Sequence, residues 1–134
     1  MIDLSTTYGG LKLKSPLIVS SSGLTSSVER IKKMEQAGAG AVVLKSLFEE
    51  QIMFEANSMS TESDYPEAAD YVNAYARENS LESYLDMIRE AKAAVKIPVI
   101  ASINCVKSNE WIEFAKKIEQ AGADALELNI YFLP

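Results

Sequence analysis

Short apolar runs alternate with amphipathic stretches along most of this chain. Four of the apolar runs have the length of buried strands and end in polar residues; they lie at 17–22, 41–46, 98–104 and 125–130. Between them, apolar residues recur every three or four positions and predict three helices, from Ser26 to Gly38, from Asn79 to Val95 and from Ser108 to Gly122. Strands that alternate with helices indicate an α/β fold built on a parallel sheet.

The predicted helices begin at residues that commonly cap helices. Ser26 is followed three positions later by Glu29, and Asn79 by Glu82, which are the spacings of a capping box. Ser108 is the expected cap of the third helix.

Two segments fall outside this alternation. Residues 1–15 surround the pair Gly9-Gly10 and predict a small hairpin. A long connection, 47–79, holds two weakly helical pieces at 48–55 and 68–76, separated by the polar residues 58–63. Connections of this length in compact folds are usually lids or other functional segments.

A repeat relates two of the helical units. Met-Glu-Gln-Ala-Gly-Ala-Gly-Ala at 34–41 is nearly copied, 84 residues later, at 118–125, which places Lys45 and Asn129 at the same point after a strand. Half of that offset suits one unit of a (β/α)₈ barrel with an insertion, whereas a doubly wound sheet usually opens with a glycine-rich phosphate turn that this sequence lacks. We therefore predict that residues 1–134 form one domain, the N-terminal half of such a barrel, with four parallel strands, three main helices and an N-terminal hairpin.

The composition of the chain argues against several classes of partner and catalytic site. The chain has 134 residues, 48% of them apolar, a net charge of −6 and no histidine. The excess of acidic over basic residues, and the lack of a basic face, argue against a nucleic-acid partner. No apolar run reaches the length of a membrane span. The lack of histidine excludes Ser-His-Asp and Cys-His catalysis and argues against a metal site. The single cysteine, Cys105, cannot form an internal disulfide, which suits the cytosol.

Polar residues follow all four predicted strands. They are Ser21-Ser22-Gly23, Lys45-Ser46, Asn104 and Asn129. Because the strands of a barrel end on one face, these side chains should converge where barrel enzymes hold their active sites. Serine runs and asparagines also serve as ordinary turn residues. Lys45 fits that reading less well, because a lysine directly after Ala-Val-Val-Leu would be costly to bury unpaired.

Several of these motifs together resemble the class-one dihydroorotate dehydrogenases. They are Leu-Lys-Leu-Lys-Ser-Pro at 11–16, Ser-Ser-Gly at 21–23, Val-Leu-Lys-Ser at 43–46 and Ala-Leu-Glu-Leu-Asn at 125–129. Ile-Ala-Ser-Ile-Asn-Cys at 100–105, followed by Trp111, is also similar to the pyrimidine-reducing domain of dihydropyrimidine dehydrogenase. The resemblance implies an FMN-containing (β/α)₈ barrel that moves hydride between the flavin and a dihydropyrimidine ring.

The resemblance also implies roles for the strand-end residues. Ser21-Ser22-Gly23 would line the flavin, and Ser46 would bond its edge. Lys45 would lie beside the flavin ring, where a positive charge stabilises the reduced anionic form. Asn129 would bridge flavin and pyrimidine, so that Lys45 and Asn129 also contact the substrate. Asn104 would be a further flavin contact.

The sequence departs from the family pattern in three places. The family takes its catalytic base from a cysteine in a Ser-Cys-Pro-Asn type of loop, whereas Phe132 stands at that position and cannot accept a proton, so that no catalytic residue is assigned. The substrate loop after the second strand keeps only the start of its usual pattern, at 57–63. The loops after strands seven and eight, which bind the phosphate in such barrels, have no counterpart among these residues. We therefore expect little activity and no tightly bound FMN from the chain by itself.

Two other functions stay open on the sequence. One is a non-catalytic half-barrel that assembles into oligomers, and the other is a lysine-dependent lyase in which Lys45 forms a Schiff base. The open edges of the first and fourth strands predict a homodimer or larger homo-oligomer, in which a second copy covers the exposed apolar faces.

Overall fold

The computed structural model describes residues 2–60 and 66–131, with helices and strands in the alternation that the sequence predicts. In chain order the elements are β1 (Thr6–Tyr8), β2 (Leu11–Leu13), β3 (Ile18–Val19), the 3₁₀ helix η1 (Gly23–Thr25), α1 (Val28–Gln36), β4 (Ala41–Val43), β5 (Leu47–Phe48), α2 (Glu49–Ser60), α3 (Pro66–Ala94), β6 (Val99–Asn104), α4 (Ser108–Ala121) and β7 (Ala125–Leu128). Among the described residues, no helix is both long enough and apolar enough to cross a membrane.

The main sheet is parallel throughout. β3 pairs with β4, β4 with β6, and β6 with β7. β5 also pairs with β6, on the same edge as β4 but nearer the carboxyl end of β6. β4 and β5 therefore occupy one strand position in the sheet. The four positions follow chain order, as consecutive strands of a (β/α)₈ barrel do, and the half-barrel prediction is confirmed.

The junction between β4 and β5 is irregular, and the sequence did not predict β5. Val43 pairs with Ile100 and Leu47 with Ile103, so the three residues 44–46 stand opposite only two residues of β6. One extra residue on one strand is a bulge, which bends the chain and redirects its side chains. The bulge contains two of the predicted site residues, Lys45 and Ser46.

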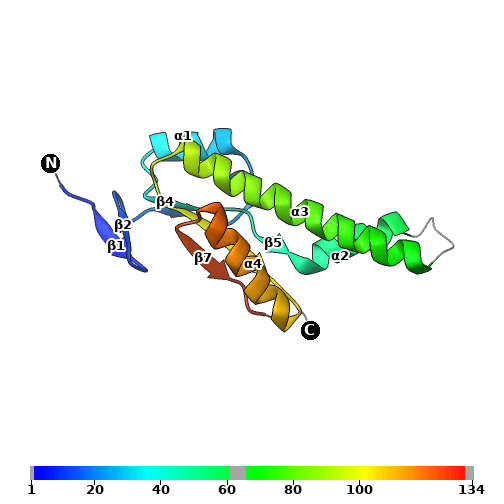
Figure 1. Cartoon of the computed structure of the whole chain (residues 1–134). Coiled ribbons are helices and arrows are strands. Elements are labelled where there is room, and N and C mark those ends of the chain that lie inside the picture. The colour runs from blue at the N-terminus through cyan, green and yellow to red at the C-terminus, as the bar shows by residue number, and fades with distance from the viewer. Residues whose placement is uncertain (1, 61–65, 132–134) are drawn as a thin grey trace.

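α1, α4 and the C-terminal part of α3 cover one face of the sheet, whereas α2 and the start of α3 extend beyond it (Figure 1). Ile31 of α1, Ile88 of α3 and Phe114 of α4 are fully buried in a single cluster with the strand residues that point toward them. The opposite face carries a smaller cluster, in which Leu13 of the hairpin packs against β4 and β6. Helices on one face only are the arrangement of a barrel wall, where the other face looks inward.

The N-terminal hairpin forms as predicted. β1 and β2 pair antiparallel, and both residues of the turn, Gly9 and Gly10, have positive φ angles of 54° and 83°. Two such residues suit the two-residue turns that match the twist of a hairpin, and glycine adopts them without strain.

The repeated sequence folds into the same unit twice. α1 and α4 each end at a glycine with positive φ, Gly38 at 101° and its copy Gly122 at 96°. In both units the residue after the glycine donates its N–H to a carbonyl of the last helical turn, Ala39 to Met34 and Ala123 to Ile118. This closure stops each helix and sends the chain directly into a buried strand, β4 or β7.

The start of the second predicted helix was wrong. α3 runs without a break from Pro66 to Ala94, and Asn79, the predicted cap, lies inside it. No glycine or proline follows Pro66 before the helix ends, so nothing in the local sequence stops it. The helical piece predicted at 48–55 corresponds to α2, which continues to Ser60; residues 61–63 of the predicted polar break lie outside the described part.

The other two predicted caps were also wrong. The capping box near the first helix belongs to η1 and joins Ser22 to Thr25, while the Ser26 hydroxyl donates to the carbonyl of Gly23. α1 begins after Ser27, whose side chain makes no capping hydrogen bond.

At α4, Ser108 is the first helical residue and Lys107 is the N-cap. The carboxylate of Glu49, from the start of α2, accepts hydrogen bonds from the N–H groups of Val106, at 2.6 Å, and Lys107, at 3.2 Å. A side chain distant in sequence thus satisfies two N–H groups at the entrance to α4, one of them on the N-cap residue itself.

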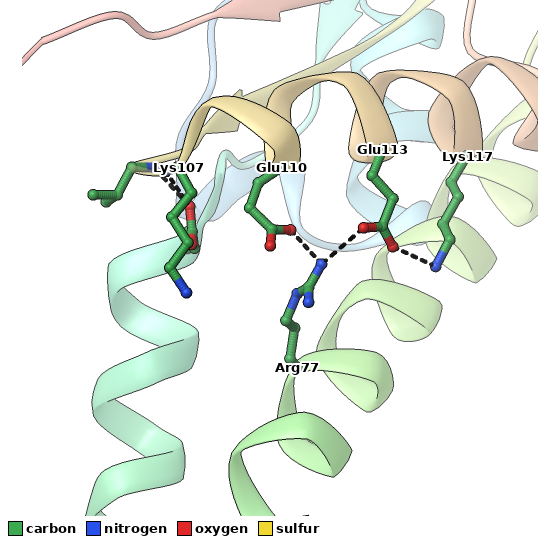
Figure 2. Close-up of polar contacts among 7 residues, drawn as sticks. Arg77, Lys107, Glu110, Glu113 and Lys117 are labelled. Carbon is green, nitrogen blue, oxygen red and sulfur yellow. Dashed lines mark hydrogen bonds and ion pairs between the residues drawn. The ribbon is translucent and has the colours of Figure 1, made fainter. Parts of the chain in front are cut away.

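Arg77 joins α3 to α4 in the same region. Its guanidinium donates to the carboxylates of Glu110 and Glu113 and lies 5.6 Å from the centre of the Phe114 ring. Figure 2 shows Arg77 pointing from α3 toward the two glutamates, with Lys117 bonded to Glu113 one turn further along α4. Glu110 is buried whereas Arg77 and Glu113 are partly exposed, so these contacts join α3 to α4 at the edge of the helix interface.

Candidate functional site

A hollow of about 460 Å³ lies at the carboxyl ends of the strands. Six of the seven predicted cofactor-binding residues line it: Ser21, Ser22, Gly23, Lys45, Ser46 and Asn129. They come from three different strand ends, so the convergence follows from parallel strands meeting at one edge. Phe48, Glu127 and Tyr131 complete much of the wall.

The serine-rich segment after β3 is held by its own hydrogen bonds. The Ser22 side chain accepts from the N–H of Leu24, and the N–H of Ser22 donates to the Thr25 hydroxyl, whose residue is fully buried. Ser21 reaches across to the bulge, where its hydroxyl lies 2.9 Å from both the N–H and the hydroxyl of Ser46. These contacts fix the loop after β3 against the bulge after β4.

Lys45 lines the hollow, but the argument that singled it out was wrong. The sequence suggested a lysine that would be costly to bury, whereas the side chain is exposed. The physical reason is the bulge at 44–46, which takes the chain out of the buried strand immediately after Leu44. Lys45 forms no ion pair with another described residue, so its positive charge stays available to a ligand.

The two predicted asparagines occupy different positions. Asn129 lines the hollow, and its Nδ2 donates to the hydroxyl oxygens of Ser46, at 3.1 Å, and Ser102, at 2.9 Å. Asn104 is buried and does not line the hollow, and its Nδ2 donates to the backbone carbonyl of Asn129 at 2.6 Å. Asn104 therefore holds the end of β7 in place and is not part of the hollow wall.

Two residues of the site, Ser102 and Glu127, were missed by sequence reasoning. Ser102 is fully buried in the middle of β6, and its hydroxyl donates to Glu127 Oε1 at 2.6 Å. Both lie inside predicted strands and not at their ends, where the search for polar residues was made. The available signal was a serine and a glutamate within otherwise apolar strands, Ile-Ala-Ser-Ile and Ala-Leu-Glu-Leu.

Tyr84 of α3 supports Ser102 from the helical face. The Tyr84 hydroxyl accepts from the N–H of Ser102 at 2.9 Å and donates to the carbonyl of Ser102 at 3.1 Å. Both backbone groups face the bulge, where the neighbouring strand does not continue the ladder. Burial raises the pKa of the Tyr84 phenol to about 12, so it stays protonated and able to donate.

Two predictions about the site fall partly or wholly outside the described residues. Phe132, which stands where relatives of the predicted family carry the catalytic base, lies beyond residue 131. The altered substrate loop at 57–63 lies partly in α2, which ends at Ser60, and partly among residues 61–63, which are outside the described part. No catalytic residue is assigned to this site.

Comparison with known proteins identifies the family of this chain. The sequence profile of the dihydroorotate dehydrogenase family matches residues 3–131. The catalytic subunit of dihydroorotate dehydrogenase B (NAD(+)) from Thermoplasma volcanium is 34% identical over 137 residues, which cover 97% of this chain and 42% of that protein. NAD-dependent dihydropyrimidine dehydrogenase subunit PreA from Escherichia coli K12 is 32% identical over 134 residues, covering 95% of this chain and 32% of that protein.

A solved structure supports the fold. The IMP dehydrogenase/GMP reductase-like protein from Corynebacterium glutamicum superposes with a TM-score of 0.54 at 15% identity, over 98% of this chain and 36% of that chain. The chain thus spans less than half the length of each of these proteins. With a profile match over nearly all of its residues and a half-barrel that gathers the expected strand ends around one hollow, the chain belongs to the dihydroorotate dehydrogenase family.

Proposed function

We propose that this chain forms the ring-binding part of a flavin-dependent oxidoreductase that acts on a dihydropyrimidine-type ring. The observation that carries the proposal is the shared hollow, to which three strand ends contribute hydroxyl groups, an amide and a lysine. Its volume of about 460 Å³ lies in the range of small-molecule sites, about 300–1,000 Å³. Relatives at 31–34% identity are dihydroorotate and dihydropyrimidine dehydrogenases, which supports the substrate class.

The residues present fit an FMN ring. Such a ring carries polar nitrogens and oxygens along one edge, and the hollow offers a polar wall to meet them, with Lys45 and the Ser22 hydroxyl as groups that could bond to the ring. When bound, a flavin supplies hydride transfer, which no side chain can perform. Lys45 would contribute positive charge beside the ring and so favour negative charge that develops there, while Asn129 would orient the substrate ring.

Binding of the FMN phosphate is proposed to depend on residues outside the four strand positions described here. In (β/α)₈ barrels the phosphate site is built by the loops after strands seven and eight. We therefore propose that the chain by itself binds a flavin ring weakly, does not retain FMN through purification and turns over little substrate. Phe132 in place of a cysteine base supports low dihydroorotate oxidation as well, because loss of a general base costs about 10²–10⁴ in rate.

A lysine-dependent lyase gains no support from the site. Schiff-base lysines need a neutral amine, which desolvation or a neighbouring cation provides. Lys45 is exposed to water at the rim of the hollow. We expect borohydride to trap no carbonyl ligand on Lys45.

We also propose that a second copy of the chain covers the β7 edge. Within the described residues, β7 pairs with β6 and with no other strand, which leaves one row of backbone groups open. Beside it, Ile112, Leu128 and Ile130 are exposed and line an apolar groove of about 510 Å³. A two-fold axis would bring two such edges together and bury both grooves.

We also propose a cytosolic location. The single cysteine, Cys105, supports it, because this residue is buried and forms no disulfide.

Titration with riboflavin and FMN tests the function. Riboflavin has the ring without the phosphate, so both compounds should bind the chain with equal affinity, within about twofold. Lys45→Ala should weaken both about tenfold, since a hydrogen bond to a charged group contributes about 1.5–3 kcal/mol. Lys12→Ala, at an exposed hairpin position outside the hollow, is the matched control. Absence of any flavin spectral change with the wild-type chain, or equal binding by Lys45→Ala, would contradict the proposal.

A further inference from the structure

The hollow is backed by a continuous chain of polar side chains that ends in a carboxylate. The hydroxyl oxygens of Ser21 and Ser46 are 2.9 Å apart, and those of Ser46 and Ser102 are 2.7 Å apart. The Ser102 hydroxyl in turn lies 2.6 Å from Glu127 Oε1. Asn129 Nδ2 is within hydrogen-bond distance of both Ser46 and Ser102.

The carboxylate determines which way every hydroxyl in this chain points. An ionised Glu127 can only accept, so the single hydroxyl hydrogen of Ser102 is committed to it. Ser46 must then donate to Ser102, because the Ser102 hydrogen is no longer available for that contact. By the same reasoning Ser21 must donate to Ser46, while its oxygen accepts from the N–H of Ser46.

This order also determines the orientation of the Asn129 amide. The oxygens of Ser46 and Ser102 have only lone pairs left to offer, so the amide must turn its NH₂ group toward them. The NH₂ group then faces the two serine oxygens, and Oδ1 is turned away from them. Asn129 lines the hollow, and the group that it has left for a ligand is the acceptor Oδ1. The amide therefore has a fixed orientation, with its acceptor oxygen free of the serine hydroxyls.

We infer that Glu127 is a positioning residue, which orients the Ser21–Ser46–Ser102 hydroxyl chain and thereby makes Asn129 an acceptor that selects rings carrying an N–H donor. The inference about polarity stands on the contacts of the protein alone. Its application to a dihydropyrimidine ring, whose ureide nitrogens carry such hydrogens, rests on the proposed function. Without Glu127, the Ser102 hydrogen could turn to Ser46 or to Asn129, and the amide could rotate.

The first test needs no ligand. In the wild-type chain, NMR should show slow solvent exchange for the Asn129 side-chain amide hydrogen that is bonded to the serine oxygens. Glu127→Met, of similar length and without an oxygen acceptor, should speed that exchange by about tenfold or more, as expected for loss of one or two hydrogen bonds. Glu127→Gln, which keeps one acceptor oxygen, should give a smaller increase. Glu119→Gln, at an exposed position on α4, is the matched control and should have no effect.

Three outcomes would overturn the inference. They are fast exchange of the Asn129 amide in the wild type, unchanged exchange in a folded Glu127→Met variant, and an equal increase in the Glu119→Gln control. Ser102→Ala offers a second route if Glu127→Met does not fold, because it interrupts the chain between Glu127 and Ser46 and should also speed exchange. If neither variant folds, the wild-type exchange rate alone decides.

The second test adds a ligand. Dihydrouracil should shift the Asn129 side-chain resonances of the wild type, and its N,N-dimethylated form should bind about tenfold more weakly, because it has no N–H for Oδ1. Glu127→Met should reduce that discrimination to about twofold or less. Equal discrimination in both proteins would contradict the role of Glu127 in selectivity. If dihydrouracil does not bind at all, the proposed function fails, whereas the exchange measurements still decide the polarity of the hydroxyl chain.

Discussion

Replacing Glu49 with alanine tests how the α2–α3 insertion is fastened to the half-barrel. The Glu49 carboxylate is almost completely buried, and it accepts from the N–H groups of Val106, at 2.6 Å, and Lys107, at 3.2 Å. Glu49→Ala leaves both donors at the start of α4 without this acceptor. Because one carboxylate caps α4 from another element, the substitution should loosen the contact between α2 and α4 as well as α4 itself.

The magnitude follows from these two bonds. Hydrogen bonds to a charged group contribute about 1.5–3 kcal/mol each, and the longer bond to Lys107 belongs at the lower end. Part of the loss is offset, because the variant no longer buries a carboxylate. We expect the free energy of unfolding to fall by about 2 kcal/mol, a large share of the roughly 5–15 kcal/mol typical of a domain. Glu49→Gln, which keeps one acceptor oxygen, should lose about half as much.

The assay is urea unfolding followed by circular dichroism and by fluorescence of Trp111, the one tryptophan of the chain. Glu50→Ala is the matched control, because Glu50 is the exposed neighbour in the same helical turn, and it should change stability by no more than about 0.5 kcal/mol. Alkylation of the buried Cys105 reports local opening and should be faster in Glu49→Ala. Equal stability of the Glu49→Ala and Glu50→Ala variants would refute the capping role.

Three further predictions concern packing, pH and assembly. Gly40→Ala should clearly lower the melting temperature, because a Cβ there would lie 2.0 Å from the backbone oxygen of Ser15. Gly23→Ala, with open space around its Cβ, should leave the melting temperature unchanged, and similar melting curves for the two variants would refute this reasoning. Stability should fall as the pH rises from about 9.0 toward 12. Burial first, and nearby glutamates second, raise the pKa of the Cys105 thiol from 9.0 to about 12 in the folded chain, so the thiol ionises first in the unfolded chain. Cys105→Ala should flatten this part of a stability–pH profile measured by urea unfolding. Light scattering should give the mass of a dimer, and Leu128→Glu, at a half-exposed position on β7, should reduce it to about that of one chain; a wild-type mass near 14.7 kDa would refute self-association.

Local sequence was enough to predict the repeated helix–turn–strand units. Gly38 and Gly122 adopt positive φ angles that stop α1 and α4, and each is followed by a short apolar strand. Both features act over a few residues, so the same eight-residue pattern folds in the same way twice. Parallel strand order then brings the polar strand ends together, which is why residues as distant as Ser21 and Asn129 could be assigned to one hollow before the structure was known.

What the sequence could not indicate depends on contacts between residues far apart in the chain. The start of α4 is held by Glu49, which accepts from the N–H of Val106, 57 residues further along the chain. No local motif reveals such a partner. The bulge at 44–46 exposes Lys45, and it arises only because β4 and β5 both pair with β6. The polarity of the site depends on Glu127, whose partner is known only once the fold places its carboxylate 2.6 Å from the Ser102 hydroxyl. Local backbone preferences thus determine the elements, whereas buried hydrogen bonds between them, which need exact partners in space, determine what the hollow can bind.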